Sequence, residues 1–258
     1  MKLKFIILHI VLGLLFSAES TTGVTNDTGF QYSVKSNGNG LVKFSSPEYT
    51  FDSFEVDDGK IYKKPVLSNP SFTSEAGLPD LPSRTTFIAV DPSKNYTLEV
   101  TYGSSRSVEN IDIAPKGSWD NDDNEIISTS MSYGSIENFY PEKIATISEP
   151  MAMRELSLLM LTVSPFRYFP EEKRLEEFLD IEIELIESGN RETTMFYPSK
   201  RSRAFEPLYE SLIENYSSLN RENIPYQRPS ILYVLPNNIG NLLGTVEVLM
   251  DWKRRQGY

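Results

Sequence analysis

An acidic loop is the first place where the sequence could carry chemistry. The hexapeptide DNDDNE places Asp120, Asp122 and Asn124 at alternate positions, as in the opening of an EF-hand calcium loop. The sixth position lacks the glycine of such loops, and the twelfth is Met131, where a bidentate acid belongs. We therefore expect a solvated acidic loop and no cofactor for this chain, with calcium in the full-length protein as the alternative.

Paired carboxylates are the second candidate. Glu171, Glu172, Glu176 and Glu177 lie close together and could suggest the acid and base of a glycoside hydrolase. They flank a predicted turn on a charged face, so we expect them to be structural or solvated.

Cysteine and histidine chemistry is excluded by composition. The chain has no cysteine, and its one histidine, His9, lies in the N-terminal leader. This removes thiol nucleophiles, Ser/His pairs and most transition-metal sites. We expect no catalytic, cofactor-binding or metal-binding residue, so that the chain as given is not an enzyme. A net charge of −11 also argues against a nucleic-acid partner.

The N-terminus reads as an export signal. Lys2 and Lys4 precede an apolar run from Phe5 to Phe16, and Ala18 and Ser20 have the spacing that a signal peptidase accepts. The run is shorter than the roughly 20 residues of a membrane-spanning helix, which favours a cleaved signal. A retained membrane anchor is the alternative. We expect a signal peptide over residues 1–20, cleaved after Ser20. The protein would be exported across the inner membrane to the medium or cell surface, with no membrane contact after cleavage.

Residues 21–192 have the pattern of an antiparallel β domain. Strand-length runs occur at 98–103, 108–115, 155–168 and 178–187, the last alternating strictly between apolar and acidic residues. Residues 169–177 suit a hairpin connection, and Asp58-Gly59 predicts a turn between two strands within 51–67. We expect a mainly β, antiparallel β-sandwich-like domain.

Residues 193–228 read as a linker with processing sites. Alternation is lost, and residues 206–216 could form a short amphipathic helix. Proteases cut exposed, irregular connections. Four arginines are candidate cleavage sites, and the alternative for each is an ordinary solvated charge: Arg201, Arg203, Arg221 and Arg228.

Residues 229–258 read as one βα unit. An apolar run at 230–235 predicts a buried strand, and apolar residues spaced by three and four from Ile239 predict a helix ending near Gly257. A buried parallel strand needs neighbours on both edges. We therefore expect the start of a truncated α/β domain, completed beyond Tyr258 or by a partner supplied in trans.

Several motifs together resemble the propeptide region of gingipain-like cysteine peptidases. They are GLPDLPSRTTFIAVDP (77–92), VENIDIAP (108–115), FYPEK (139–143) and EPMAMRELSLLMLTVSPFRYFPEEKRL (149–175), in that order. The tail, ILYVLPNN followed by LMDWKRRQGY, looks like the first strand and helix of the caspase-like catalytic domain of that family.

The resemblance implies a latent peptidase precursor of bacteria. In this family the prodomain holds its peptidase latent, helps it to fold and is removed at basic residues near the junction, where Arg228 lies here. The partners implied are the chain's own downstream peptidase domain in cis and a processing protease. No position matches the family's catalytic His or Cys, so the full-length precursor, and not this chain, would be the cysteine endopeptidase.

Two other function classes stay open. A free-standing secreted β-sandwich module that binds carbohydrate or protein would need an exposed aromatic platform, for which Trp119, Tyr140 and Phe166 are candidates. A catalytic domain in its own right would depend on carboxylates alone.

Overall fold

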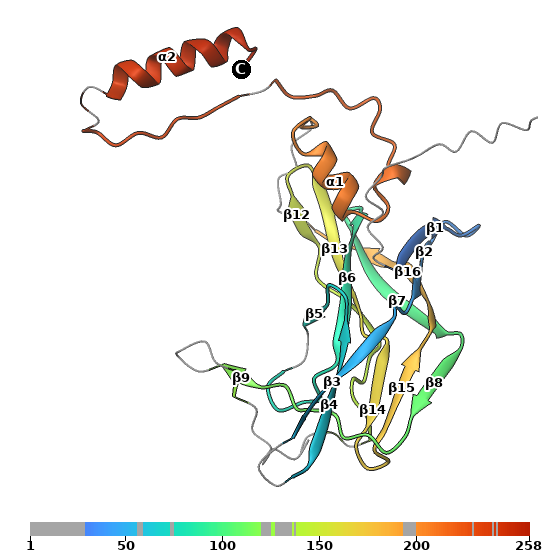
Figure 1. Ribbon diagram of the computed structural model, residues 1–258. Helices are drawn as coiled ribbons and strands as arrows, with labels where there is room; N and C mark the ends of the chain where they lie inside the picture. Colours follow the sequence, from blue (N-terminus) through green and yellow to red (C-terminus); the bar gives the residue numbers. More distant parts are fainter. Residues whose placement is uncertain are drawn as a thin grey trace, which may run out of the picture.

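The fold is seen in a computed structural model (Figure 1). It describes residues 29–55, 59–72, 75–119, 125–126, 136, 138–192, 200–228, 230–238, 240 and 242–258. The named strands in these ranges pair antiparallel, and two α-helices follow them. The expectation of a mainly β chain with antiparallel sheets is confirmed.

The first sheet has the order β1-β2-β16-β7. Its strands are β1 (Phe30–Val34), β2 (Gly40–Ser45), β16 (Asp180–Asn190) and β7 (Lys94–Tyr102). In β16, Ile181 and Ile183 are buried while Glu182 between them is exposed. This is the alternation predicted for 178–187, and it turns one face of the sheet toward the core.

The second sheet has the order β11-β13-β6-β5, and β12 also pairs with β13. Its strands are β11 (Ala145–Ile147), β13 (Leu156–Val163), β6 (Pro82–Val90), β5 (Ser71–Phe72) and β12 (Met151–Met153). One buried apolar cluster contains residues of both sheets, among them Val42, Phe44 and Ile183 from the first and Ile88, Leu161 and Val163 from the second.

A second, smaller apolar cluster joins a hairpin to a three-stranded sheet, with Leu67 from the hairpin and Phe166 and Leu175 from the sheet. The hairpin pairs β3 (Tyr49–Glu55) with β4 (Ile61–Leu67), as the Asp-Gly signal predicts, and Gly59 takes a positive φ of 78°. The sheet has the order β14 (Phe166–Phe169), β15 (Arg174–Phe178), β8 (Ser105–Val108). The short strands β9 (Ser118–Trp119) and β10 (Glu125–Ile126) form a separate pair.

Two of the predicted strands differ from the structure. The run 108–115 is not one strand, because β8 ends at Val108 and Asn110 takes a positive φ of 55° that breaks the extended backbone. The run 155–168 is divided into β13 and β14, which belong to different sheets. Pro165 lies at the break, where its missing N–H leaves no donor for a continuous ladder.

The hairpin expected at 169–177 is present but joins different strands from those predicted. It connects β14 to β15, and β16 begins only at Asp180 in the first sheet. The periodicity of side chains identifies strands, whereas the choice of sheet depends on distant partners.

The C-terminal part contains α1 (Glu206–Leu212), a 3₁₀ turn η1 (Tyr216–Ser218) and α2 (Leu242–Arg255). The predicted helix after Ile239 is therefore present. The strand predicted at 230–235 is not formed, and Leu232 and Val234 are 87% and 84% exposed. A strand needs a paired neighbour, and no described strand lies beside this segment. Figure 1 shows this segment and α2 apart from the sheets. Among the described residues, no helix is long and apolar enough to cross a membrane.

Candidate functional site

Residues 200–227, which we call the strap, lie against the second sheet. Tyr209 of α1 is fully buried, and Ile213 just after the helix is 3% exposed. Both belong to a cluster with Ala89 of β6 and Leu158 of β13. Figure 1 shows α1 at the end of β6, β12 and β13. Burial of these side chains favours a docked strap over a solvated one.

An asparagine pairs the strap with a strand backbone. The Oδ1 atom of Asn215 accepts a hydrogen bond from the Ala89 N–H, and its Nδ2 donates to the Ala89 carbonyl, both at 2.8 Å. Asn215 is only 5% exposed. Its amide therefore satisfies both backbone groups of a β6 residue that would otherwise be left unpaired at a buried position.

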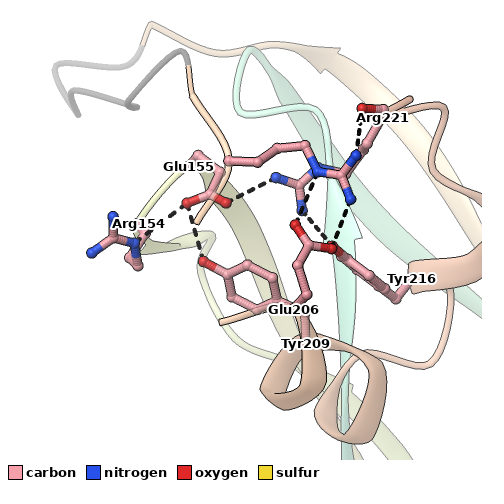
Figure 2. Close-up of polar contacts among 7 residues, drawn as sticks. Arg154, Glu155, Glu206, Tyr209, Tyr216 and Arg221 are labelled. Atoms are coloured by element: carbon pink, nitrogen blue, oxygen red, sulfur yellow. Dashed lines mark hydrogen bonds and ion pairs between the residues drawn. The ribbon is translucent and has the colours of Figure 1, made fainter. Parts of the chain in front are cut away.

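A carboxylate from the turn between β12 and β13 also holds the strap (Figure 2). Glu155, between β12 and β13, accepts hydrogen bonds from the Arg221 Nη2 at 2.9 Å and from the Tyr209 hydroxyl at 3.1 Å. Arg154 lies 3.5 Å from the same carboxylate. The side chains of Glu155 and Arg221 are 4% and 8% exposed, so this ion pair is buried. Removing one member of such a pair leaves the other charge uncompensated.

A second ion pair lies within the strap. Arg201 donates to Glu206 through Nε and Nη2, at 2.9 and 2.8 Å, in a bidentate arrangement. The Tyr216 hydroxyl donates to the same carboxylate and accepts from the Arg221 Nη1 at 2.9 Å. The two ion pairs are thus joined into one network through Tyr216.

The pKa values fit this network. The hydrogen bond from Arg201 lowers the pKa of Glu206, and the hydrogen bond from Tyr216 acts in the same direction. Burial raises the pKa of Tyr209, and burial together with the bond to Glu206 raises that of Tyr216 to about 12. Both phenols therefore stay protonated at neutral pH and act as donors to carboxylates.

The four arginines predicted as processing sites fall into two groups. Arg201 and Arg221 are brought together in the network, where Arg201 Nη1 also donates to the Arg221 carbonyl at 2.9 Å. Arg203 and Arg228 are exposed. The Arg203 guanidinium lies 4.7 Å above the Tyr226 ring, and Arg228 comes just after Gln227, whose N–H donates to the Arg201 carbonyl at 2.8 Å.

Sequence reasoning missed Glu155, Tyr209 and Asn215 as contact residues. Glu155 was the first residue of a predicted strand, and Asn215 lay in a predicted helix. The partners of these residues are 54 to 126 positions away in the chain, so no local pattern could have indicated them.

The remaining sequence candidates give no further site in the described chain. Ser20, Asp120, Asp122, Asn124 and Met131 lie outside the described residues, and within those residues no group of acids could hold a metal ion. Glu177 is buried and bonds to Ser46 and Arg106, not to a second carboxylate. Phe166 is fully buried and cannot line a sugar-binding face.

Known proteins resemble this chain over most of its length. Gingipain R2 of Porphyromonas gingivalis W83 is 27% identical over 227 residues, which are 83% of this chain and 30% of the relative. Gingipain R1 of P. gingivalis is 22% identical over 229 residues, 84% of this chain and 23% of the relative. The chain thus spans less than a third of these relatives.

Two solved structures share the fold. The chain in the complex of P. gingivalis RgpB pro- and mature domains matches with a TM-score of 0.62 and 22% identity, covering 74% of this chain and 98% of that one. A structure on zymogenic latency of P. gingivalis gingipain K matches with a TM-score of 0.52 and 17% identity, covering 63% and 93%. The sequence also matches the family Propeptide_C25 over residues 31–220. Because that match spans most of the chain, this protein belongs to the Propeptide_C25 family of gingipain propeptides.

Proposed function

We propose that this chain is the exported prodomain of a gingipain-like cysteine endopeptidase, which keeps the peptidase latent and assists its folding until it is cut away. The observation that carries the proposal is the family match over residues 31–220. The likeness to a chain from a complex of pro- and mature domains supports the same fold for this chain. A prodomain joined in cis can reach an effective concentration in the millimolar range, so modest contacts are enough to block a site.

The proposed organisation follows the sequence boundaries. A signal peptide of residues 1–20, cleaved after Ser20, precedes a β-sandwich-like prodomain of residues 21–192, a processing segment of residues 193–228, and the first βα unit of a caspase-like domain at 229–258. In support of the last part, no residue of α2 is buried, and Trp252 is 50% exposed. Such apolar surface needs cover, which the downstream peptidase domain would supply.

We propose Arg228 as the junction cut by the processing protease. Its side chain is exposed, and residues 230–235 after it are exposed or half-buried and outside any strand. Proteases nick exposed backbone that makes few contacts. The residue after the bond is Pro229, so the processing protease has to be one that cuts Arg–Pro bonds. Once the bond is hydrolysed, the tethered inhibitor becomes an ordinary ligand that can dissociate.

Inhibition in trans tests this function. The purified chain is added to the mature peptidase domain of its own precursor, and hydrolysis of a protein substrate is followed. We expect saturable inhibition, no hydrolysis by the chain alone, and no inhibition by chain unfolded in urea and diluted. If the folded chain leaves the peptidase fully active, the latency role is wrong, and a free-standing binding module becomes the better explanation.

A further inference from the structure

We infer that the docked strap makes Arg201 and Arg221 cryptic cleavage sites, which an arginine-specific protease can use only after the strap opens. Glu155 of the β12–β13 turn controls the exposure of Arg221, and Glu206 within the strap controls that of Arg201. The biological meaning of the inference depends on the proposed function, but the shielding itself does not. It concerns which peptide bonds of this chain are accessible to an added protease.

Arg221 is blocked at both places that such a protease must reach. Its guanidinium, 8% exposed, donates to Glu155 and to the Tyr216 hydroxyl, each at 2.9 Å. Its carbonyl, which belongs to the bond that would be cut, accepts from Arg201 Nη1 at 2.9 Å. A protease needs the side chain in its specificity pocket and the carbonyl oxygen in its oxyanion hole. Neither is free in the docked strap.

Arg201 is blocked in a similar way. Its guanidinium is held by both oxygens of Glu206, and its side chain is 15% exposed. Its N–H donates to the Pro225 carbonyl at 3.0 Å, and its carbonyl accepts from the Gln227 N–H at 2.8 Å. The N–H and the carbonyl of Arg201 are therefore both paired with the far end of the strap, which forms a β-bridge there. A protease would have to displace this segment to bind the backbone of Arg201.

Exposed arginines nearby provide the contrast. Arg228 follows the last strap residue and has an exposed side chain. Arg203 is also exposed, but its neighbour Ser202 is only 5% exposed and Phe205 packs on the cluster around Tyr209. The bond after Arg228 leads to Pro229, where trypsin-like proteases cut poorly, so Arg228 is a suitable reference only for a protease that accepts proline there. With such a protease we expect cleavage after Arg228 first, then after Arg203, and after Arg221 and Arg201 only once the strap has opened.

The chemistry at each site is simple hydrolysis. Water adds across the peptide bond, which leaves a carboxylate on the arginine and a new amino terminus on the next residue. When opening and closing are fast relative to cleavage, the rate at a shielded site follows the population of the open form. A cut after Arg228 thus leaves the strap on the prodomain, whereas undocking allows further cuts that separate α1 from the sheet and make the loss of the docked form irreversible.

Limited proteolysis of the full chain with an arginine-specific endopeptidase that also cuts Arg–Pro bonds tests the inference. Fragments are identified by mass spectrometry, and a rate is obtained for each site. In the unmodified chain we expect cleavage after Arg228 to be at least about tenfold faster than after Arg221 or Arg201. In Glu155→Gln we expect cleavage after Arg221 to accelerate on the order of a hundredfold, because the buried guanidinium loses its counter-charge.

Glu149→Gln is the matched control. It makes the same change at a carboxylate that is 89% exposed and paired with Arg191 at 3.1 Å, so the rate at Arg221 should not change. Glu206→Gln is a second variant, and it should accelerate cleavage after Arg201. Circular dichroism identifies a variant that has lost the β-sheets, in which case the other variant decides.

Two results would overturn the inference: cleavage of the unmodified chain after Arg221 as fast as after Arg228, or unchanged rates at Arg221 and Arg201 in both folded variants. Either would leave the latency role standing, because that role is measured by inhibition of the peptidase. Conversely, failure of inhibition would leave the shielding unaffected.

Discussion

Tyr209→Ala should release the strap from the second sheet. The ring of Tyr209 is fully buried, with Phe205 at 5.9 Å and Tyr216 at 5.6 Å between centroids, and its hydroxyl donates to Glu155 at 3.1 Å. Truncation of a buried aromatic residue to alanine costs about 3–5 kcal/mol. The buried carboxylate keeps its bond to Arg221 but loses one donor, so the upper half of that range is expected.

Tyr209→Phe separates the ring from the hydroxyl. It keeps the packing and removes one hydrogen bond to a charged acceptor, which costs about 1.5–3 kcal/mol. The expected order of strap stability is therefore wild type, then Tyr209→Phe, then Tyr209→Ala.

Hydrogen exchange followed by mass spectrometry measures this locally. If the strap opens separately from the sheets, a loss of about 3 kcal/mol or more in Tyr209→Ala should speed amide exchange in α1 by more than about a hundredfold, up to the limit of a fully open strap. Exchange in β16 should change little. The reasoning is refuted if exchange in α1 differs less than about tenfold between Tyr209→Ala and wild type while the sheets stay folded.

Three further outcomes are expected. Asn215→Ala leaves both backbone groups of Ala89 unpaired and should lower the free energy of unfolding, measured in urea, by about 2–4 kcal/mol. The control Asn95→Ala, at an exposed asparagine, should change this free energy little. Equal effects of the two substitutions would contradict the pairing. Hydrogen bonds lower the pKa of Glu206, so its ionised carboxylate stabilises the docked strap above the ordinary pKa of a glutamate, and this stabilisation is lost as the pH falls below about 4.3. Amide exchange in the strap should therefore speed up in acid, and should speed up less in Glu206→Gln. In the full precursor, Arg228→Gln should slow maturation, followed on immunoblots, by about tenfold or more. Arg221→Gln should leave the sizes of the fragments produced at the junction unchanged. Normal maturation of Arg228→Gln would show that the junction is not cut after Arg228.

Some of the fold could be predicted because its signals are local. The alternation of Ile181, Glu182 and Ile183 identifies β16 and its buried face, and the Asp-Gly turn identifies the β3–β4 hairpin. The spacing of apolar residues likewise predicts α2. In each case the pattern repeats over neighbouring residues, so the side chains themselves report the geometry of the backbone.

The strap could not be predicted in this way. Its sequence loses alternation and carries four basic residues, which is the pattern of an irregular connection. Its position depends on Glu155 and Ala89, which lie 66 residues or more before the strap residues Arg221 and Asn215 that they contact. Ala89 and Glu155 come near one another because β6 and β13 are paired, and this pairing joins segments far apart in the chain.

The sequence by itself therefore determined the antiparallel β character, the helix α2, the lack of cysteine and the set of arginines available for cleavage. Only the tertiary structure decided which of those arginines are accessible. An arginine has the same chemistry wherever it occurs in the chain. Its availability to a protease depends on whether carboxylate and backbone groups lie within hydrogen-bonding distance. The β12–β13 turn supplies Glu155 for Arg221, the folded strap supplies Glu206 for Arg201, and the side chain of Arg228 is exposed.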